Sequence, residues 1–493
     1  MHRSISSLVC GLVCLTVLIG VAACSDDSGG QSPEADTVKQ AETGSAPAPD
    51  RPNILFIMTD DQNLDDLEYM PFVESLLVEK GTSFENAIVT DPVCCPSRAT
   101  ALRGQYTHNH EIKGTKPPAG GWEKFRDLGL GKSTIATWLQ DAGYRTAHVG
   151  KYLNGYLNTT YVPPGWDEWH AFNGGGYYDF TLDENGENVF YEGSENYQTD
   201  VLNEKAVDFI RESDGEESPF FMHLTPWAPH GPVEPAPRHE DLFTDEELPM
   251  PPSFSEADVS DKPAWVREEP RIDEAEVAEV TEWHQDRLRT LAAVDEGIRD
   301  VVDALRETGQ LENTYIFFTS DNGYMMGEHR LSKIKAMAYE EAINMPLIVR
   351  GPGVPEGRTV DHLALNTDFA PTFAELGGAS VPGFVDGRSL MPLLEGEPPP
   401  KADWRHSVLV YNKNNLLINL PEYWAVRMEE WSYVRYSTGE EELYNLREDP
   451  FQLESVDDTV DRQFLQNLRR QSRQLSRCAA DRCRALEDRE LRP

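Results

Sequence analysis

The feature that most constrains the fold is a series of short apolar runs, each of which leads into polar or charged residues. Residues 53–58 form the first run and are followed by Asp60 and Asp61. Runs of the same kind occupy residues 146–149, 220–224, 315–318 and 347–349. Short runs that are apolar throughout are typical of strands buried on both faces of a parallel sheet.

Helical patterns lie between these runs. Ser133 is predicted to cap one helix that ends before Gly143, and residues 288–305 form a longer amphipathic helix. This alternation predicts an α/β fold with a mostly parallel central sheet and helices on both faces. Ligands of such folds bind beyond the carboxyl ends of the strands. The polar residues that follow the runs are therefore candidate site residues.

A proline-rich break at residues 398–400 separates this pattern from the rest of the chain. We predict a main domain over residues 51–397 and a C-terminal α+β subdomain over residues 398–493. The subdomain is expected to hold a small antiparallel sheet and a terminal helix. Its strand-like runs are residues 407–411, 423–427 and 431–435, and its helix covers residues 460–475.

The N-terminal residues are predicted to be a targeting segment rather than part of the fold. An apolar run over residues 8–23 ends in small residues before Cys24, which resembles a bacterial lipoprotein signal. This predicts a signal peptide over residues 1–23 and a lipid-carrying Cys24 at the outer face of a bacterial cell membrane. An ordinary cleaved signal peptide is the alternative. Residues 24–50 are rich in Ser, Gly, Pro, Ala and acids and are predicted to be a flexible tether.

The charge balance limits the partners of the chain. It carries 85 acidic and 44 basic residues, a net charge of −41. Such a surface disfavours nucleic acid and anionic membranes as long-range partners, although it also serves solubility alone. An anionic substrate would need a local pocket of Lys, Arg and His side chains.

The cysteines fall into separate groups. Because the chain is predicted to be exported, we expect a disulfide between Cys478 and Cys483, and no further zinc ligands are obvious near that pair. Cys94 and Cys95 are adjacent, and neighbouring cysteines rarely form a disulfide because its geometry is strained. The segment that contains them carries the most specific motif of the sequence.

The motif is Cys94-Cys95-Pro96-Ser97-Arg98, followed by Ala-Thr-Ala-Leu-Arg-Gly. Without further context it could be the start of a helix with Pro96 in the first turn. It resembles the signature of the sulfatases, a family of alkaline-phosphatase-like hydrolases. The resemblance implies that a maturation enzyme oxidises Cys94 to formylglycine. One oxygen of the hydrated aldehyde would attack sulfur and release the alcohol, and the second hydroxyl would then expel sulfate.

Two pairs of oxygen-bearing side chains follow separate apolar runs. Asp60 and Asp61 follow the first, and Asp321 and Asn322 follow residues 315–318. Each pair alone could be an ordinary turn or cap. The resemblance implies that these four residues bind Ca²⁺, with the formylglycine at Cys94 completing the site. Mg²⁺ is the second choice, since both ions prefer oxygen ligands.

The resemblance also implies cationic residues and a proton donor. Arg98, Lys151 and Lys335 would offset the charge of the sulfate oxygens, and His230 would protonate the leaving alkoxide. Lys333 competes with Lys335, but the Lys-x-x-x-Tyr-Glu spacing favours Lys335. His329 is a weaker candidate for orienting sulfate. Each lysine could instead be an ordinary surface group.

One position departs from the family. Many sulfatases have a histidine two residues after the lysine that Lys151 matches, and here that residue is Leu153. This variant, together with residues 106–110 and 163–166, resembles N-acetylglucosamine-6-sulfatases and the extracellular heparan 6-sulfatases. The implied partner is a sulfated carbohydrate, such as a 6-O-sulfated N-acetylglucosamine.

Two other functions remain open from the sequence. One is a phosphatase or phosphonate hydrolase of the same superfamily, although no His-rich cluster for a second metal is evident. The other is a lipid-anchored protein that binds glycans without turnover, which would follow if Cys94 stays unmodified.

Overall fold

The structure is a computed structural model that describes residues 51–413 and 419–493. The predictions for the signal peptide, Cys24 and the tether lie outside the described residues. Among the described helices, none is both long and apolar enough to span a bilayer.

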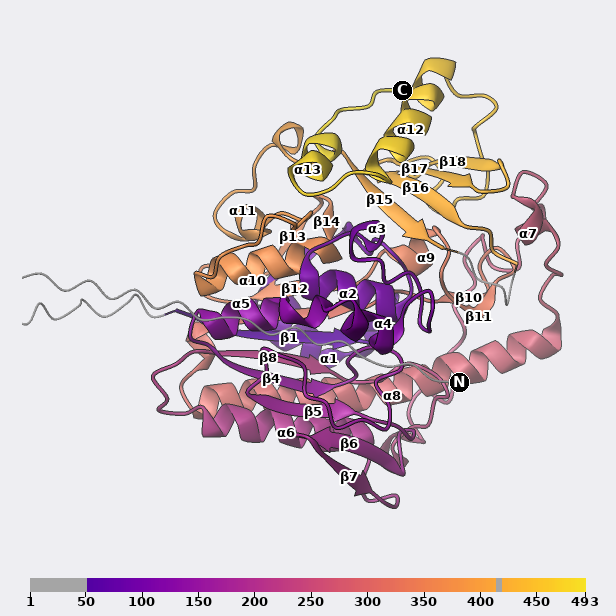
Figure 1. The fold of residues 1–493 in the computed structure, drawn as a ribbon. Coiled ribbons are helices and arrows are strands. Elements are labelled where there is room, and N and C mark those ends of the chain that lie inside the picture. Colours follow the sequence, from indigo (N-terminus) through magenta and orange to yellow (C-terminus); the bar gives the residue numbers. More distant parts are fainter. Residues whose placement is uncertain (1–50, 414–418) are drawn as a thin grey trace, which may run out of the picture. The chain divides into compact units, whose positions relative to one another are not determined.

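A ten-stranded mixed sheet forms the centre of the fold (Figure 1). Its order is β13 (Arg358–Val360), β2 (Thr82–Phe84), β12 (Leu347–Arg350), β9 (Thr314–Ser320), β1 (Asn53–Thr59), β8 (Phe220–Thr225), β4 (Arg145–Gly150), β5 (Glu168–Phe172), β6 (Phe180–Glu184) and β7 (Glu187–Tyr191). The five strands from β9 to β5 run parallel. The predicted mostly parallel sheet is therefore confirmed.

Strand β12 differs from the expectation, because it pairs antiparallel with both β9 and β2. After β9 the chain stays at the carboxyl edge of the sheet. It forms the small pair β10 (Met325–Met326) and β11 (Ser332–Ile334) and the short helix α9 (Glu340–Ile343). Without a crossover helix to return the chain to the opposite edge, β12 has to run back against β9.

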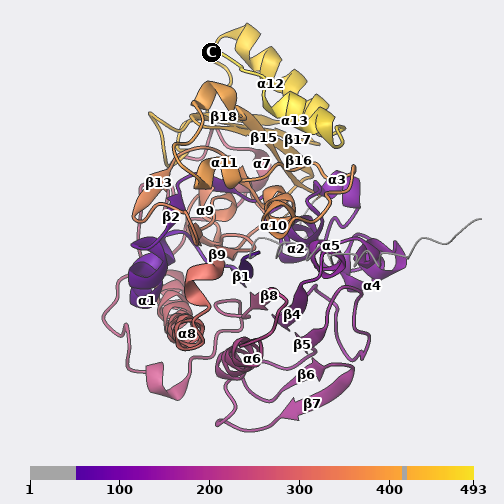
Figure 2. The same ribbon diagram turned by 90° about the vertical axis from the view of Figure 1, so that its left-hand side faces the viewer.

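Helices cover both faces of the sheet (Figures 1 and 2). On one face Ile54 and Phe56 pack with α2 (Cys94–Arg103), α5 (Ile135–Asp141) and α10 (Phe369–Gly377). On the other face Leu55 and Ile57 pack with α6 (Gln198–Glu212) and α8 (Glu274–Glu307). Alternate residues of β1 thus enter different cores, which is why its sequence is apolar throughout.

Two predicted helices begin at other residues than expected. Helix α5 is capped by Thr134, one residue after the expected Ser133, since Thr134 and Thr137 form a capping box. Ser133 instead accepts a hydrogen bond from the Trp138 indole (2.9 Å). Helix α8 starts well before residue 288, because the Asp273 side chain accepts hydrogen bonds from two N–H groups of its first turn.

The C-terminal part contains the expected antiparallel sheet, with one strand more than predicted. Its strands are β15 (Ser407–Asn412), β16 (Tyr423–Met428), β17 (Trp431–Tyr436) and β18 (Glu441–Asn445). Helices α12 (Arg462–Leu475) and α13 (Asp481–Glu487) follow, and the predicted disulfide joins Cys478 to Cys483. The domain boundary at residue 397 stays a prediction.

The remaining α-helices and strands are short and connect these layers. They are α1 (Pro71–Val73), α3 (Thr107–His110), α4 (Gly121–Asp127), α7 (Ala264–Arg267), α11 (Met391–Leu394) and the two-stranded pair β3 (Ala87–Ile88) and β14 (Ala364–Leu365).

Candidate active site

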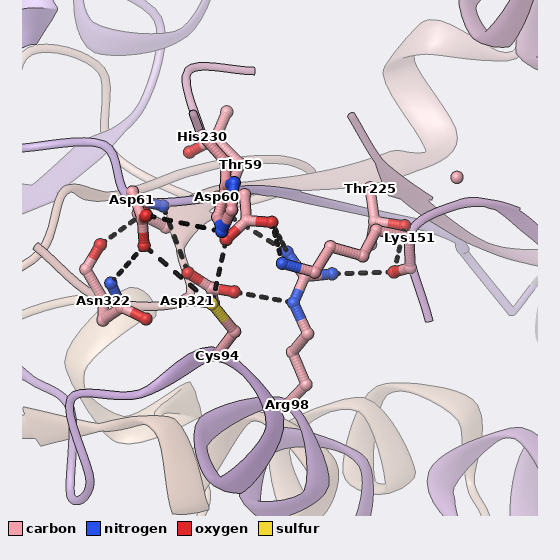
Figure 3. A network of polar contacts seen from close by, with 12 residues as sticks. Thr59, Asp60, Asp61, Cys94, Arg98, Lys151, Thr225, His230, Asp321 and Asn322 are labelled. Carbon is pink, nitrogen blue, oxygen red and sulfur yellow. Dashed lines mark hydrogen bonds and ion pairs between the residues drawn. The ribbon is translucent and has the colours of Figure 1, made fainter. Parts of the chain in front are cut away.

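The two predicted oxygen-bearing pairs meet at one edge of the sheet. Strands β1 and β9 are parallel neighbours in register, so Asp60 and Asp61 emerge beside Asp321 and Asn322. The Asp61 N–H donates to Asp321 Oδ1 (3.2 Å), and Asn322 Nδ2 donates to Asp61 Oδ1 (2.6 Å) (Figure 3). All four residues are buried. Sheet register therefore brings together residues about 260 positions apart in the sequence.

Cys94 faces these carboxylates from the first position of α2. Its side chain is buried, and its Sγ lies 3.2 Å from Asp60 Oδ1 and 4.0 Å from Asp61 Oδ1. The helix starts here because Val93 is extended and because Pro96, in the first turn, needs no intrahelical N–H bond. Ligand atoms of Asp60, Asp61, Cys94 and Asp321 all lie within 4.8 Å of one another.

The predicted cationic residues surround this group. Lys335 Nζ lies 2.7 Å from Cys94 Sγ and also contacts Asp61, whereas Lys151 contacts Asp60. Arg98 Nε donates to Asp321 Oδ2 (2.6 Å), and its Nη1 donates to the Lys151 carbonyl (2.7 Å). The competing Lys333 pairs with Glu279 instead.

The charges of this cluster perturb its pKa values. Burial favours the neutral form of Asp60, but Lys151, His230 and Arg98 outweigh it and hold the pKa well below the usual range. Burial and the neighbouring Asp60 raise the pKa of Asp321 to about 6. Burial, with Asp321 and Asp60 nearby, raises the pKa of the Cys94 thiol well above its ordinary value.

His230 lies at the more open side of the cluster, on the loop after β8. Its side chain is 27% exposed, and Nε2 is 3.9 Å from Asp61 Oδ2. Nδ1 donates to the Gly231 carbonyl (2.5 Å), and the ring stacks on Trp227. This bond leaves Nε2 as the nitrogen that faces the carboxylates. Burial lowers the pKa of His230.

Two residues singled out in the sequence lie apart from this cluster. His329 is fully buried, stacks on Tyr339 and bonds to Glu256 through Nδ1 (2.7 Å). Leu153 is buried in the same apolar cluster as Cys95 and Ala99 of α2. Its side chain supplies no polar group in place of the histidine of many sulfatases.

Arg287 supports the site and was missed by the sequence analysis. It lies on α8, is buried, and donates from Nη2 to the Asp61 carbonyl (2.6 Å) and to Asp66 (3.1 Å). The available signal was an arginine on the apolar side of an amphipathic helix, because a buried charge needs a partner.

The residues present fit a divalent cation. Asn322 Oδ1 is buried and has no hydrogen-bond partner among the described residues. A buried acceptor without a partner is costly, and a metal ion would satisfy it. Three carboxylates and this amide oxygen form the hard oxygen donor set that Ca²⁺ and Mg²⁺ prefer.

Comparison with known protein families assigns the chain to a family. Residues 52–379 match the family described as Sulfatase, and residues 327–478 match the one described as N-sulphoglucosamine sulphohydrolase, C-terminal. The first match covers most of the chain, which therefore belongs to the sulfatase family.

Individual proteins of this family are similar to the chain over different shares of their length. The chain is 37% identical to the putative extracellular sulfatase Sulf-1 homolog of Caenorhabditis elegans over 73% of its own length and 52% of that protein. The chain is 32% identical to the extracellular sulfatase SULF-1 homolog of Drosophila melanogaster, and the alignment covers 83% of this chain and 37% of that protein. The chain thus spans about half or less of these two relatives. It is 31% identical to human N-acetylglucosamine-6-sulfatase, covering 88% of this chain and 86% of that protein.

A solved structure is similar over nearly the same extent. The structure of BT4656 in complex with its substrate D-glucosamine-2-N,6-O-disulfate has a TM-score of 0.76 and 26% identity, covering 86% of this chain and 97% of that one. The phosphonate monoester hydrolase SpPMH from Silicibacter pomeroyi has a TM-score of 0.66 and 23% identity, covering 86% and 94%. This second likeness concerns the fold alone.

Proposed function

We propose that this protein hydrolyses the sulfate esters of a carbohydrate, such as a 6-O-sulfated N-acetylglucosamine, with Cys94 converted to formylglycine. The observation that carries the proposal is the position of Cys94. Cys94 is the first residue of a helix and lies next to three buried carboxylates and two lysines. A helix N-terminus also directs backbone N–H groups toward an anion.

The proposed metal ion is Ca²⁺, held by Asp60, Asp61, Asp321 and Asn322 together with the modified Cys94. When bound, it would supply positive charge that polarises a sulfate oxygen. Asn322 Oδ1, for which the described part of the chain offers no hydrogen-bond partner, supports this assignment. The same oxygen ligands would accept Mg²⁺, which is the second choice.

The chain's own cations divide between two proposed roles. The side chains of Lys151 and Lys335 are 8% and 18% exposed, and their ammonium groups would bind the sulfate oxygens. The Arg98 side chain is fully buried and holds Asp321 and the Lys151 backbone. We therefore assign Arg98 to positioning, although its charge still acts on the site.

His230 is the proposed proton donor to the leaving alcohol. A sugar alkoxide is a poor leaving group, so protonation during bond cleavage matters. His230 Nε2 faces the cluster and its ring is the most exposed of the predicted site residues. The departing sugar would accordingly lie on this side of the carboxylates.

The substrate class draws support from the relatives. Human N-acetylglucosamine-6-sulfatase aligns over most of both chains, and BT4656 is similar in fold. Export and lipid attachment at Cys24 also remain part of the proposal, as does a partner enzyme that generates formylglycine. The likeness to a phosphonate monoester hydrolase is too distant to favour that activity.

The test is sulfate release by residues 51–493 produced with a formylglycine-generating enzyme. The substrates are N-acetylglucosamine 6-sulfate, an aryl sulfate and an aryl phosphate, with Cys94→Ala as the control. We expect sulfate release from the sugar, its loss in the variant and its loss after chelation of divalent cations. Release only from the aryl sulfate would reject the substrate class. No release, with formylglycine confirmed by mass, would reject the activity.

A further inference from the structure

Lys335 lies at the start of a connecting segment, residues 335–339, that joins β11 to α9 and has no regular secondary structure. Its Nζ is nevertheless placed 2.7 Å from Cys94 Sγ. The next residue, Ala336, has a φ of 94°, a left-handed conformation that residues with a Cβ rarely adopt. A strained residue of this kind relaxes unless neighbouring groups hold it. The position of Lys335 is therefore determined by contacts from outside the segment.

The strand before the connecting segment contacts helix α8. On β11, Lys333 pairs with Glu279 and Ser332 Oγ donates to Glu276. The ion pair is partly exposed, and pairs of this kind contribute little to stability. Both contacts precede Lys335 in the chain. They do not hold the strained residue that follows it.

The connecting segment itself packs on the C-terminal sheet. Residues 336–339 belong to the same apolar cluster as Tyr423 of β16. The Tyr423 hydroxyl donates to the Ala336 carbonyl (2.9 Å), and both residues are buried. Among the described residues, no other group donates to this carbonyl. Burial raises the pKa of Tyr423 well above its ordinary value, so the phenol keeps its proton and remains a donor.

Two further side chains of the C-terminal sheet hold the end of the segment. Glu442, on β18, accepts a hydrogen bond from the Tyr339 hydroxyl (2.9 Å). Arg427, on β16, donates to both carboxylate oxygens of Glu340 (2.7 and 2.8 Å). Of these contacts, the one made by Tyr423 lies nearest in sequence to the active-site lysine. A buried carbonyl that loses its donor is costly, so this single hydroxyl has a large share in holding the backbone there.

From these contacts we infer that Tyr423 is a positioning residue, which holds Lys335 within reach of the substrate sulfate through the Ala336 carbonyl. The inference rests on the proposed function and deepens it, because it gives the C-terminal sheet a part in the reaction. Tyr423 acts through the backbone and does not itself bind the substrate. The effect of removing its hydroxyl should therefore disappear once the Lys335 side chain is absent.

The first test is a double-mutant cycle between Tyr423→Phe and Lys335→Ala, measured with an aryl sulfate on the formylglycine form of residues 51–493. Tyr423→Phe removes one oxygen atom and keeps the ring in the core. We expect it to lower kcat/KM about tenfold, because small displacements of a substrate-binding group have large effects. In the Lys335→Ala protein the same substitution should have no further effect. Equal losses in the two backgrounds would overturn the inference.

The matched control is Tyr433→Phe. Tyr433 lies on the neighbouring strand β17, is buried, and donates from its hydroxyl to Glu441 of the same sheet (2.7 Å). The control thus removes a tyrosine hydroxyl from the C-terminal sheet without touching the connecting segment. Its kcat/KM should equal that of the parent protein, and thermal unfolding measures any loss of stability in both variants. Equal losses of kcat/KM in Tyr433→Phe and Tyr423→Phe would contradict a specific role.

A second test needs no turnover and so separates this inference from the proposed function. It compares crystal structures of the parent and of Tyr423→Phe, grown under the same condition. We expect Lys335 Nζ to contact Asp61 in the parent, and to be displaced from it in the variant as Ala336 leaves the left-handed region. This displacement would support the inference even if no sulfate were released. Lys335 in the same position in both structures would overturn it.

Discussion

Asp61 illustrates how a single residue is held for its role. Its φ of 71° lies in the left-handed region, which aspartate tolerates better than most residues. The conformation is held on both sides, since the Asp61 N–H donates to Asp321 and its carbonyl accepts from Arg287. The turn brings the Asp61 carboxylate close to that of Asp60. A strained backbone conformation of this kind persists only where surrounding contacts hold it, as these two hydrogen bonds do.

At the same scale we predict that His230→Ala impairs turnover selectively. On N-acetylglucosamine 6-sulfate, kcat should fall by about 10²-fold or more, because the alkoxide loses its proton donor. On an aryl sulfate the loss should be much smaller, since a phenolate leaves without protonation. Steady-state kinetics on both substrates checks this, with His406→Ala, a partly buried histidine of the C-terminal part, as the control. Equal losses on the two substrates would contradict the assignment.

At the scale of elements, the approach of β4 to β8 determines where Lys151 lies. Gly150 has a φ of 115°, and a Cβ there would meet the Thr225 carbonyl oxygen at 2.1 Å. Only glycine allows this approach. The Lys151 N–H then donates to the same carbonyl (2.8 Å), and Thr225 Oγ1 donates to the Lys151 carbonyl (2.8 Å). Both backbone groups of Lys151 are thus fixed to the neighbouring strand.

The β5–β6 pair supplies a pH-dependent contribution to stability. Burial opposes protonation of His170, but the carboxylates of Glu168 and Glu184, each 3.6 Å away, outweigh it and raise the pKa of the imidazole above 6.5. This stabilisation is complete below pH 6.5 and is lost as pH rises through the folded-state pKa.

We therefore expect His170→Gln to lower the free energy of unfolding mainly at acidic pH. The difference from the parent protein should be largest below pH 6.5 and should shrink toward alkaline pH. Denaturant unfolding of both proteins between pH 5.5 and 9 measures it. A difference that stays constant over this range would show that the ion pairs of His170 contribute nothing.

At the scale of the whole molecule, the C-terminal sheet shares a core with the main domain. Tyr339 and Ile343, near the site, pack in one apolar cluster with Val408 and Val426 of the sheet. A buried ion pair adds to this junction. Arg405, just before β15, donates to both carboxylate oxygens of Asp368 (2.7 and 2.8 Å), and both side chains are fully buried.

For this junction we predict that Arg405→Ala costs about 3–5 kcal/mol of unfolding free energy. The reason is that Asp368 would remain buried without its cation, and Glu487 would keep only Arg388 as a cation among the described residues. Thermal or denaturant unfolding checks the value. Arg447→Ala is the matched control, because its pair with Glu430 is exposed and should contribute about 0–1 kcal/mol. Similar midpoints for the two variants would refute the prediction.

Much of the fold was predictable from local patterns. The five apolar runs all form strands of the central sheet, because continuous apolarity is required of a strand buried on both faces. The direction of β12 was not predictable, since an apolar run carries no sign of which way it pairs. Helix α8 was underestimated, because its N-terminal part is mostly polar and its start depends on the Asp273 cap.

The sequence by itself determined the chemistry that the site can hold. The Cys-x-Pro-Ser-Arg motif and the polar residues after the apolar runs lie within short segments, where residue type and spacing are readable. The tertiary structure decided how these segments act on one another. Only strand register brings Asp61 to Asp321, and only packing turns Lys335 rather than Lys333 toward Cys94. These contacts join residues far apart in the chain, so no local pattern encodes them.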